Sequence, residues 1–311
     1  MDIGILLERQ KWSLEQKIDH AIGTVENFMA KTGRTPYVSF SGGRDSTVLL
    51  DLCRRFINPK FHAVFDNTGN EFPEIVKFVR SFDNVTIISP KVSVRDMLSK
   101  YGFPLLSKEV AKSIRDAKTT KSEKLLKIRL FGTDSSKGYV SGMIPKKWQF
   151  LIFEPFMVSE KCCDVLKKRP LAKYNKLTGE LPIIGTLASE SKARQQAYIK
   201  RGGCNSFNAN HLASYPLSIW TDKDISDYIN RFQVPVCSLY NVRGCERTGC
   251  MFCGFGAHLE KHSRFNIVYD LHPSIYRAFM RYENNGVTYR EALKKIGVLL
   301  PDEIRQLELD F

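Results

Sequence analysis

A short glycine-containing loop between an apolar strand and a helix with one apolar face constrains this chain more than any other feature. Residues 37–40 predict a strand, and residues 46–56 predict a helix. Between them, residues 41–46 read Ser-Gly-Gly-Arg-Asp-Ser. Two glycines let the backbone turn so that its N–H groups converge on an anion, and the helix adds the positive end of its dipole. The segment therefore predicts a phosphate-binding loop, with serine hydroxyls as further donors and Arg44 as a cation.

Strand-like and helical segments alternate along the rest of the first two thirds of the chain. Residues 1–32 carry apolar side chains near a 3.6-residue period, which predicts a helical segment. Further strands are predicted at 61–65, 85–88 and 181–185, and further helices near 73–82 and 191–201. This alternation predicts an α/β fold with a doubly wound, mostly parallel sheet. Ligands of such sheets lie outside the carboxyl ends of the strands.

Two stretches lack this alternation. Residues 107–147 are rich in lysine with little strand character, and residues 236–311 hold a cysteine group followed by mostly helical patterning. We therefore expect an N-terminal helical segment at 1–32, a nucleotide-binding α/β domain at 33–235 and a C-terminal cysteine-associated helical region at 236–311.

The composition is that of a soluble globular protein, with 43% hydrophobic and 26% charged residues in 311. The sequence shows no secretory signal and no run of about 18 apolar residues, so we expect a cytoplasmic protein without a membrane partner. In a reducing compartment, the eight cysteines are metal ligands or reactive thiols rather than disulfides. The net charge of +14 favours polyanionic partners, although a solvated basic surface explains it equally well.

The loop resembles the SGGxDS signature of the PP-loop ATP pyrophosphatases, and it is not a Gly-x-x-x-x-Gly-Lys-Ser/Thr loop. Residues 66–74 resemble the D-T-G-x-E-F-P-E segment of the phosphoadenylylsulfate (PAPS) reductase-like branch of that family. Residues 185–194 resemble its G-x-R-x-x-E-S-x-x-R segment, except that Leu187 stands where an arginine is usual. The resemblance covers residues 35–255 and implies an adenine nucleotide alpha hydrolase-like PP-loop fold.

The resemblance also implies which residues form the site. Asp45 would help to place Mg²⁺, which commonly combines one or two carboxylates with phosphate oxygens. Arg194 would lie near a substrate phosphate, and a surface helix cation is the alternative. The implied catalytic residues are therefore Asp45, Arg44 and Arg194. The implied residues that bind ATP are Ser41, Gly42, Gly43, Arg44, Asp45, Ser46, Asp66 and Thr68.

The cysteines form a second pattern. Cys162 and Cys163 are adjacent, and Cys250 and Cys253 form a C-x-x-C pair with Cys245 five residues before it. Adjacent cysteines are awkward ligands for one zinc ion but can bind different irons of a cluster. The set resembles the CC…CxxC set of the iron–sulfur adenylylsulfate (APS) reductases, which implies a 4Fe-4S cluster on the first four, with Cys245 as a possible substitute. A zinc site and free thiols remain alternatives.

Two features favour adenylation over reduction of APS or PAPS. The reductases attack with a cysteine in a C-terminal tail, whereas no cysteine follows Cys253 in this sequence. The reductase loop is usually altered, whereas residues 41–46 keep the complete signature. We therefore expect pyrophosphate to leave from ATP when an acceptor oxygen attacks the α-phosphorus, after which a sulfur nucleophile can displace AMP.

The acceptor is expected to be a nucleic acid. The chain resembles the PAPS reductase-like members of DNA phosphorothioation systems, which implies DNA as acceptor, a cysteine desulfurase as sulfur donor and other modification-system proteins as partners. The basic run 108–129 could follow a phosphate backbone or form a solvated helix face. The aromatic residues Phe252, Phe255 and Phe265, interleaved with Arg247, Lys261 and Arg264, could stack bases or pack in the core. Alternatives are tRNA thiolation, sulfonucleotide reduction and a non-catalytic nucleotide- or DNA-binding module.

Overall fold

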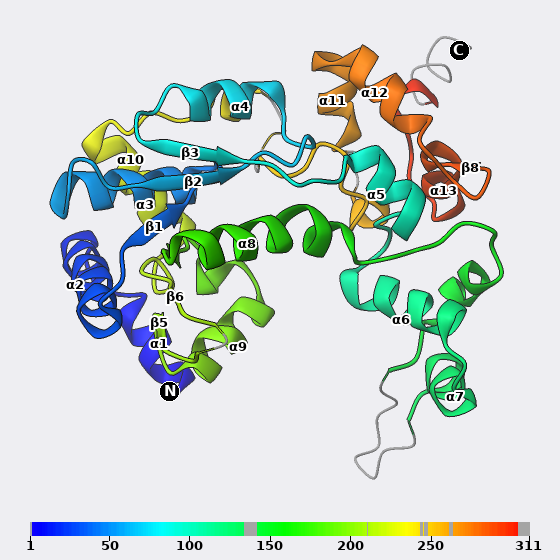
Figure 1. Cartoon of the computed structure of the whole chain (residues 1–311), viewed down its shortest axis with the longest axis horizontal. Coiled ribbons are helices and arrows are strands. Elements are labelled where there is room, and N and C mark those ends of the chain that lie inside the picture. The colour runs from blue at the N-terminus through cyan, green and yellow to red at the C-terminus, as the bar shows by residue number, and fades with distance from the viewer. Residues whose placement is uncertain are drawn as a thin grey trace. The chain divides into compact units, whose positions relative to one another are not determined.

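The chain forms two compact units in a computed structural model (Figure 1). The structure describes residues 2–133, 142–209, 211–242, 245, 248–260 and 264–303. Unit 1 comprises Met1–Asn67, Glu71–Ser89 and Pro170–Thr248, and unit 2 comprises Thr68–Asn70, Pro90–Arg169 and Gly249–Phe311. This division differs from the expected ranges 33–235 and 236–311, because residues 90–169 form one compact body with the C-terminal segment.

Unit 1 is built on a six-stranded sheet of order β3-β2-β1-β4-β6-β5. All neighbouring strands pair in parallel except β5, which is antiparallel to β6. The order reverses at β1, since β2 and β3 lie on one side of it and β4 on the other. This confirms the doubly wound α/β fold expected from the sequence. The strands are β1 (Pro36–Ser39), β2 (Ala63–Asp66), β3 (Val85–Ile88), β4 (Leu181–Ile183), β5 (Asn205–Ser206) and β6 (Ala213–Ser214).

Helices flank the sheet of unit 1. The helical segment expected at 1–32 consists of two helices, because Ser13 caps the second one: its hydroxyl accepts from the Gln16 N–H, and the Gln16 side chain accepts from the Ser13 N–H. The helices are α1 (Ile3–Arg9), α2 (Leu14–Thr32), α3 (Arg44–Phe56), α4 (Pro73–Arg80), α8 (Arg169–Thr178), α9 (Lys192–Arg201) and α10 (Asp222–Phe232).

A buried ion pair joins two of these helices. The Lys17 ammonium of α2 lies 2.7 Å from the Asp224 carboxylate of α10, and it also donates to the Gln10 carbonyl at 2.8 Å. The Asp224 carboxylate accepts further hydrogen bonds from the N–H and the hydroxyl of Thr221. Both charges are therefore satisfied although their side chains are only 2% and 11% exposed.

Unit 2 is mostly helical, as the patterning of the C-terminal region predicted. Phe252 stacks on Phe279 with 3.7 Å between ring centroids, and the buried Tyr289 donates its hydroxyl to the Phe252 carbonyl at 3.0 Å. Its elements are α5 (Val94–Tyr101), α6 (Lys108–Thr119), α7 (Glu123–Phe131), α11 (Phe265–Leu271), α12 (Pro273–Met280), α13 (Tyr289–Lys295) and the hairpin of β7 (Glu283–Asn284) and β8 (Val287–Thr288).

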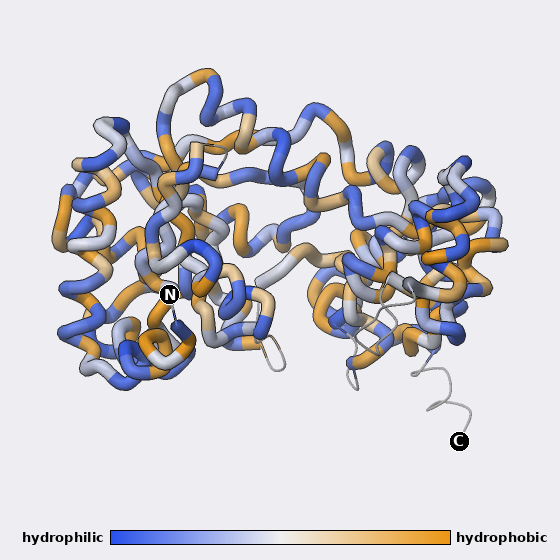
Figure 2. The backbone as a smooth tube through the Cα atoms, turned by 90° about the horizontal axis from the view of Figure 1, so that it is seen from below, coloured by the Kyte–Doolittle hydropathy of each residue, from blue (hydrophilic) through white to orange (hydrophobic). Residues whose placement is uncertain are grey.

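Hydrophobic and hydrophilic stretches alternate in short steps along the backbone (Figure 2). Among the residues that the structure describes, no helix has both the length and the apolar character that a membrane crossing requires.

Candidate functional site

The predicted phosphate loop connects β1 to α3 in unit 1. β1 ends at Ser39, and Gly43 is the N-cap of α3. The loop therefore lies at the carboxyl end of the strand where the strand order reverses. Open α/β sheets bind their ligands at this position, since helix N-termini and loops converge there.

Two serines close the loop on itself. The Ser46 hydroxyl accepts a hydrogen bond from the Ser41 N–H at 3.1 Å and donates to the Gly43 carbonyl at 3.0 Å. The Ser41 hydroxyl lies 3.0 Å from that of Ser46 and accepts from the Gly43 N–H at 3.3 Å. The turn is therefore held by hydrogen bonds of its own side chains.

Two glycines are required by close contacts. Gly42 has a φ of +72°, and a Cβ there would lie 3.0 Å from the Ile75 side chain of α4. Gly185 follows β4, and a Cβ there would lie 3.0 Å from the Asp45 carbonyl oxygen. Gly185 therefore packs directly against the backbone of the loop at Asp45 and Ser46.

A second hydroxyl pair contacts the loop from residues far along the chain. The Arg44 N–H donates to the Tyr240 hydroxyl at 3.1 Å, and the Arg44 guanidinium lies 5.2 Å from the centroid of the Tyr240 ring. The Thr248 hydroxyl is 3.0 Å from the Tyr240 hydroxyl. The sequence did not predict either residue, because no local pattern links position 44 to a tyrosine 196 residues away.

The other residues that the resemblance places near the nucleotide lie on different elements of the fold. Asp45 lies in the first turn of α3, and Asp66 ends β2 beside the parallel β1. Thr68 belongs to unit 2, where its buried hydroxyl accepts from the Asn70 N–H at 3.2 Å. Arg194 forms an ion pair with Glu190 one turn away on a partly exposed surface.

Leu187 stands where the resembling family segment usually has an arginine. Its side chain is fully buried, so it packs in the core of unit 1 instead of reaching an anion. The first turn of α9 is capped by Ser191, whose hydroxyl accepts from the Arg194 N–H at 3.2 Å. The segment 185–194 therefore offers two basic side chains in this turn, Lys192 and Arg194.

Four of the five singled-out cysteines belong to unit 2. The sulfur atoms of Cys162 and Cys163 are 3.9 Å apart. The pKa of Cys163 is lowered to about 5 because its sulfur accepts the Cys162 thiol and lies near the Lys108 ammonium. The pKa of Cys162 is raised, because its thiol donates to Cys163, is buried and feels the charges of Cys253 and Cys250. Cys163 and Cys250 are 87 residues apart in sequence. The charges of Cys250 and Cys253 nevertheless contribute to the raised pKa of Cys162.

Cys245 has another setting. It belongs to unit 1, where it is buried and where the nearby Cys237 adds to the effect of burial in raising its pKa. Within the described parts of the chain, no group of three or more His, Cys, Asp or Glu side chains is arranged to hold a metal ion. Cys162, Cys163, Cys250 and Cys253 therefore stay predicted ligands, and what the structure adds is that all four belong to unit 2.

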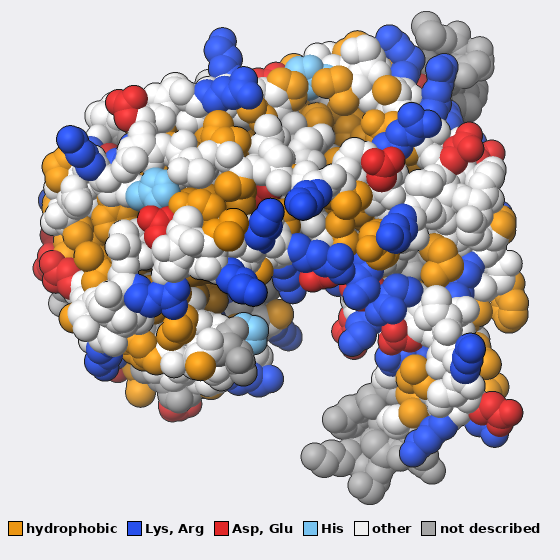
Figure 3. Space-filling view, viewed as in Figure 1, with side chains coloured by type: hydrophobic (Ala, Val, Ile, Leu, Met, Phe, Trp, Pro, Cys, Tyr) orange, Lys and Arg blue, Asp and Glu red, His pale blue; other side chains and the backbone are white. Residues whose placement is uncertain are grey.

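The basic run 108–129 falls on α6 and α7 of unit 2, and Lys and Arg side chains gather over these helices (Figure 3). Several of its cations are engaged inside the unit, including Lys108, which lies near Cys163 and the Phe255 ring. Arg115 pairs with Glu160 at 3.0 Å, Arg129 pairs with Asp116 at 2.9 Å, and Lys118 donates to backbone carbonyls. The exposed cations of the run are Lys108, Lys112, Lys121, Lys124 and Lys127.

The aromatic residues considered as base-stacking platforms lie mostly in the core of unit 2. Phe252 and Phe265 are almost completely buried, as the core-packing alternative predicted. Phe255 is partly exposed, with the Lys108 ammonium 5.9 Å from its ring centroid. Arg264 pairs with Glu260. Arg247 and Lys261 lie outside the described residues.

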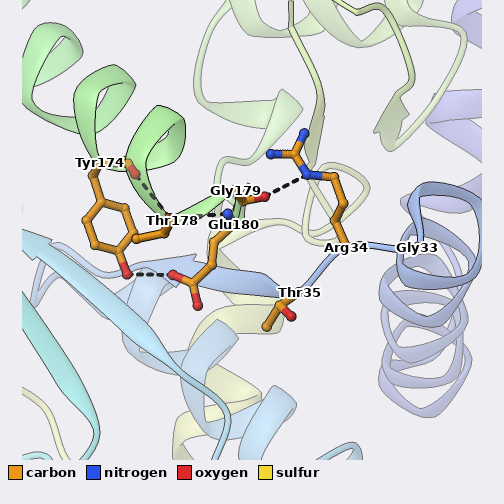
Figure 4. A pocket seen from close by; sticks show the side chains of 7 residues that line it. All are labelled: Gly33, Arg34, Thr35, Tyr174, Thr178, Gly179 and Glu180. Atoms are coloured by element: carbon orange, nitrogen blue, oxygen red, sulfur yellow. Dashed lines mark hydrogen bonds between the residues drawn. The ribbon is translucent and has the colours of Figure 1, made fainter.

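A separate cavity of about 480 Å³ lies at the other end of the strands (Figure 4). It is lined by residues around the start of β1 and by the turn before β4, where Arg34 donates to the Gly179 carbonyl and Tyr174 donates to Glu180. Because the strands of this part of the sheet are parallel, the cavity is at their amino ends. It is therefore distinct from the loop at their carboxyl ends.

Comparisons with known proteins identify the family. The model of the phosphoadenosine phosphosulfate reductase domain matches residues 35–129 and 116–254. An uncharacterized protein of Methanocaldococcus jannaschii is 25% identical over 240 residues, which cover 75% of this chain and only 39% of that relative. The crystal structure of phosphoadenylyl-sulfate (PAPS) reductase from Candida auris with phosphate aligns at 15% identity with a TM-score of 0.40, covering 74% of this chain and 85% of that one. Because the family model matches well over half of its residues, the chain belongs to the phosphoadenosine phosphosulfate reductase domain family.

Proposed function

We propose that this protein is an ATP pyrophosphatase that adenylates a nucleic-acid acceptor for sulfur insertion. Membership of the phosphoadenosine phosphosulfate reductase domain family supports a nucleotide-using, sulfur-related function. The observation that carries the proposal is the loop 41–46, which is held in shape by its own serines at the switch point of the sheet. The loop holds backbone N–H groups and hydroxyls at the positive end of the α3 dipole, which favours an anionic group such as pyrophosphate over an uncharged ligand.

In the proposed reaction, an oxygen of the acceptor attacks the α-phosphorus of ATP. The bond from this phosphorus to the bridging oxygen breaks, and pyrophosphate leaves with the electron pair. Negative charge grows on the leaving group, so donors fixed in advance around it stabilise the transition state more than the ground state. The loop N–H groups and the Arg44 guanidinium would provide that stabilisation. A sulfur nucleophile would then displace AMP from the acceptor.

Magnesium is the metal that this chemistry implies at the loop. Asp45 stands in the first turn of α3, beside the donors of the loop, and its carboxylate is the hard oxygen ligand that Mg²⁺ prefers. A carboxylate in this position fits an ion that takes its other ligands from phosphates and water. When bound, Mg²⁺ would offset the charge of the phosphates.

An iron–sulfur cluster is the second group that we propose, on Cys162, Cys163, Cys250 and Cys253. The four thiols lie in one unit, the charges of Cys250 and Cys253 act on Cys162, and an iron–sulfur cluster takes four thiolates. When bound, the cluster would tie the segment around Cys162 to the segment around Cys250.

We propose DNA as the acceptor, with a cysteine desulfurase and other modification-system proteins as partners. The net charge of +14 supports a polyanionic acceptor, and α6 and α7 carry exposed lysines, namely Lys112, Lys124 and Lys127. Salt should therefore weaken binding of the acceptor much more than binding of ATP.

The test is pyrophosphate release from ATP and Mg²⁺ by anaerobically purified protein, with DNA, with tRNA or with neither. The proposal predicts stimulation by DNA. Stimulation by tRNA alone would move the assignment to RNA thiolation. Thiol-dependent sulfite release from PAPS without ATP cleavage would establish a reductase instead. Tight ATP binding without turnover under any condition would indicate a non-catalytic nucleotide-binding module.

A further inference from the structure

A short turn in unit 1 presents Tyr240 to the phosphate loop. Residues Ser238–Asn241 form one 3-10 turn, which is anchored by the buried Leu239. The Tyr240 N–H donates to the Cys237 carbonyl at 3.1 Å, and the Val242 N–H donates to the Leu239 carbonyl at 3.0 Å. The backbone that carries the tyrosine is therefore fixed, so its side chain approaches the loop from a defined direction.

The Tyr240 hydroxyl occupies a place beside the anion-binding donors. Arg44 is the first residue of α3, and its N–H is one of the donors that a helix start leaves without a partner in the helix. Such N–H groups are the ones that bind phosphates. The Tyr240 oxygen accepts from this N–H at 3.1 Å, so it lies within the shell of groups that a bound phosphate would contact.

Thr248 completes the pair. Its hydroxyl is 3.0 Å from that of Tyr240. A Cβ placed on Gly43 would lie 3.2 Å from the Thr248 hydroxyl and 3.5 Å from the Tyr240 hydroxyl, so both oxygens lie directly against this glycine of the loop. Each hydroxyl has one proton and two lone pairs. One proton bridges the pair, and the Arg44 N–H fills a lone pair, so the second proton is left to donate to an anion.

We propose that the Tyr240–Thr248 hydroxyl pair belongs to the phosphate-binding site and donates its one remaining proton to the pyrophosphate part of the nucleotide. This inference rests on the proposed function, because it takes the loop to bind that part of ATP. The Tyr240 ring also lies against the Arg44 guanidinium, with 5.2 Å to the ring centroid, so Tyr240 contacts both the second hydroxyl of the pair and a cation of the loop. AMP lacks the two phosphates concerned, so the pair should discriminate ATP from AMP.

The test compares Tyr240→Phe with the wild-type protein in calorimetric binding of ATP, inorganic pyrophosphate and AMP. The substitution removes only the hydroxyl and keeps the ring that contacts Arg44. A hydrogen bond to a charged group contributes enough to predict a loss of about tenfold in affinity for ATP and for pyrophosphate, with AMP unchanged. Thr248→Val should weaken the same two ligands by a smaller factor. Tyr174→Phe removes a hydroxyl of the same unit at the other end of the sheet, where it bonds Glu180, and should change none of the three affinities.

Three outcomes would overturn the inference. Unchanged affinities in Tyr240→Phe would show that the hydroxyl does not contact the phosphates. Tighter pyrophosphate binding would show that it competes with the ligand. An equal loss for AMP would show that it merely shapes the loop. Failure of the wild-type protein to bind ATP or pyrophosphate would instead contradict the proposed function, so the two failures are distinguishable.

Discussion

At the scale of single residues, Gly42 is the position of the loop where a side chain is least acceptable. Its φ of +72° is left-handed, and an added Cβ would lie 3.0 Å and 3.1 Å from Ile75 and Val79. Gly42→Ala is expected to lower the free energy of unfolding by at least about 1–2 kcal/mol and to abolish detectable ATP binding, because the N–H groups of the loop must shift. Urea unfolding and ATP calorimetry measure the two effects.

Gly202→Ala is the matched control for Gly42→Ala. Gly202 has a similar φ of +77°, but a Cβ there meets nothing within 4 Å. It should lose about 1 kcal/mol of stability and keep its ATP affinity. Equal ATP affinity in the Gly42 variant and the wild type would contradict the assignment of the loop.

Gly185 tests the contact between the loop and the strand beside it. A Cβ there would lie 3.0 Å from the Asp45 carbonyl oxygen and 3.3 Å from the Ser46 nitrogen, both of which are backbone atoms. Gly185→Ala should therefore weaken ATP binding at least tenfold, because the start of α3 is pushed aside. Gly23→Ala, at an open position of α2, should leave ATP binding unchanged and slightly stabilise the protein. A Gly185 variant that binds ATP normally would refute the argument.

Some residues of the candidate site can be predicted from the sequence and others cannot, because only some of them stand in a local sequence pattern. The phosphate loop 41–46 can be recognised from the sequence, because glycines, hydroxyl residues and a helix start occur together in six positions. Tyr240 and Thr248 have no such local signature, since only the folded chain brings them to Arg44. The resemblance implied roles for Asp45, Arg194 and the four cysteines of unit 2. These roles stay predictions.

At the scale of elements, the pairing of α2 with α10 depends on one buried ion pair. Lys17→Met leaves the Asp224 carboxylate buried without its cation, which should lower the free energy of unfolding of unit 1 by about 3–5 kcal/mol. The exposed pair of Lys223 and Asp227 on α10 is the control, and Lys223→Ala should cost less than about 0.5 kcal/mol. Urea unfolding followed by circular dichroism compares them, and equal losses in both variants would exclude the buried pair as a main contact.

The elements themselves were predicted unevenly. Strands β1 to β4 and helices α3, α4 and α9 appeared within a few residues of their expected ranges, because each has a clear apolar pattern. Strands β5 and β6 have two residues each, so they are too short to show the alternation of apolar and polar residues that predicts a strand. Helix α10 was missed although Thr221 and Asp224 form a capping box, which is a readable sequence signal.

At the scale of the whole molecule, the doubly wound sheet was predictable and the composition of unit 2 was not. Parallel strands leave local patterns, whereas the union of residues 90–169 with the C-terminal segment rests on contacts between residues far apart in sequence. Asn284 illustrates this, because its side-chain amide donates to the carbonyls of Leu98 and Ser99 while its oxygen accepts from the Met157 N–H.

The cysteines of unit 2 supply a prediction at this scale. Cys163→Ser and Cys250→Ser should each remove the brown absorption and most of the iron of anaerobically purified protein, and should destabilise unit 2. Cys245→Ser should retain the iron, because Cys245 belongs to unit 1. Iron content per chain is the measurement. Full retention of iron in the first two variants would rule out the cluster, and loss of iron in Cys245→Ser would make Cys245 a ligand.

The most direct test of the proposed adenylation is to identify which bond of ATP is cleaved. The products formed by wild-type protein from ATP and Mg²⁺ in the presence of DNA would be identified by mass spectrometry, with Asp45→Ala as the loop variant. The account predicts pyrophosphate, together with AMP that is either released or attached to the acceptor, and no pyrophosphate from Asp45→Ala. Formation of ADP and inorganic phosphate, or unchanged pyrophosphate release by the variant, would contradict it.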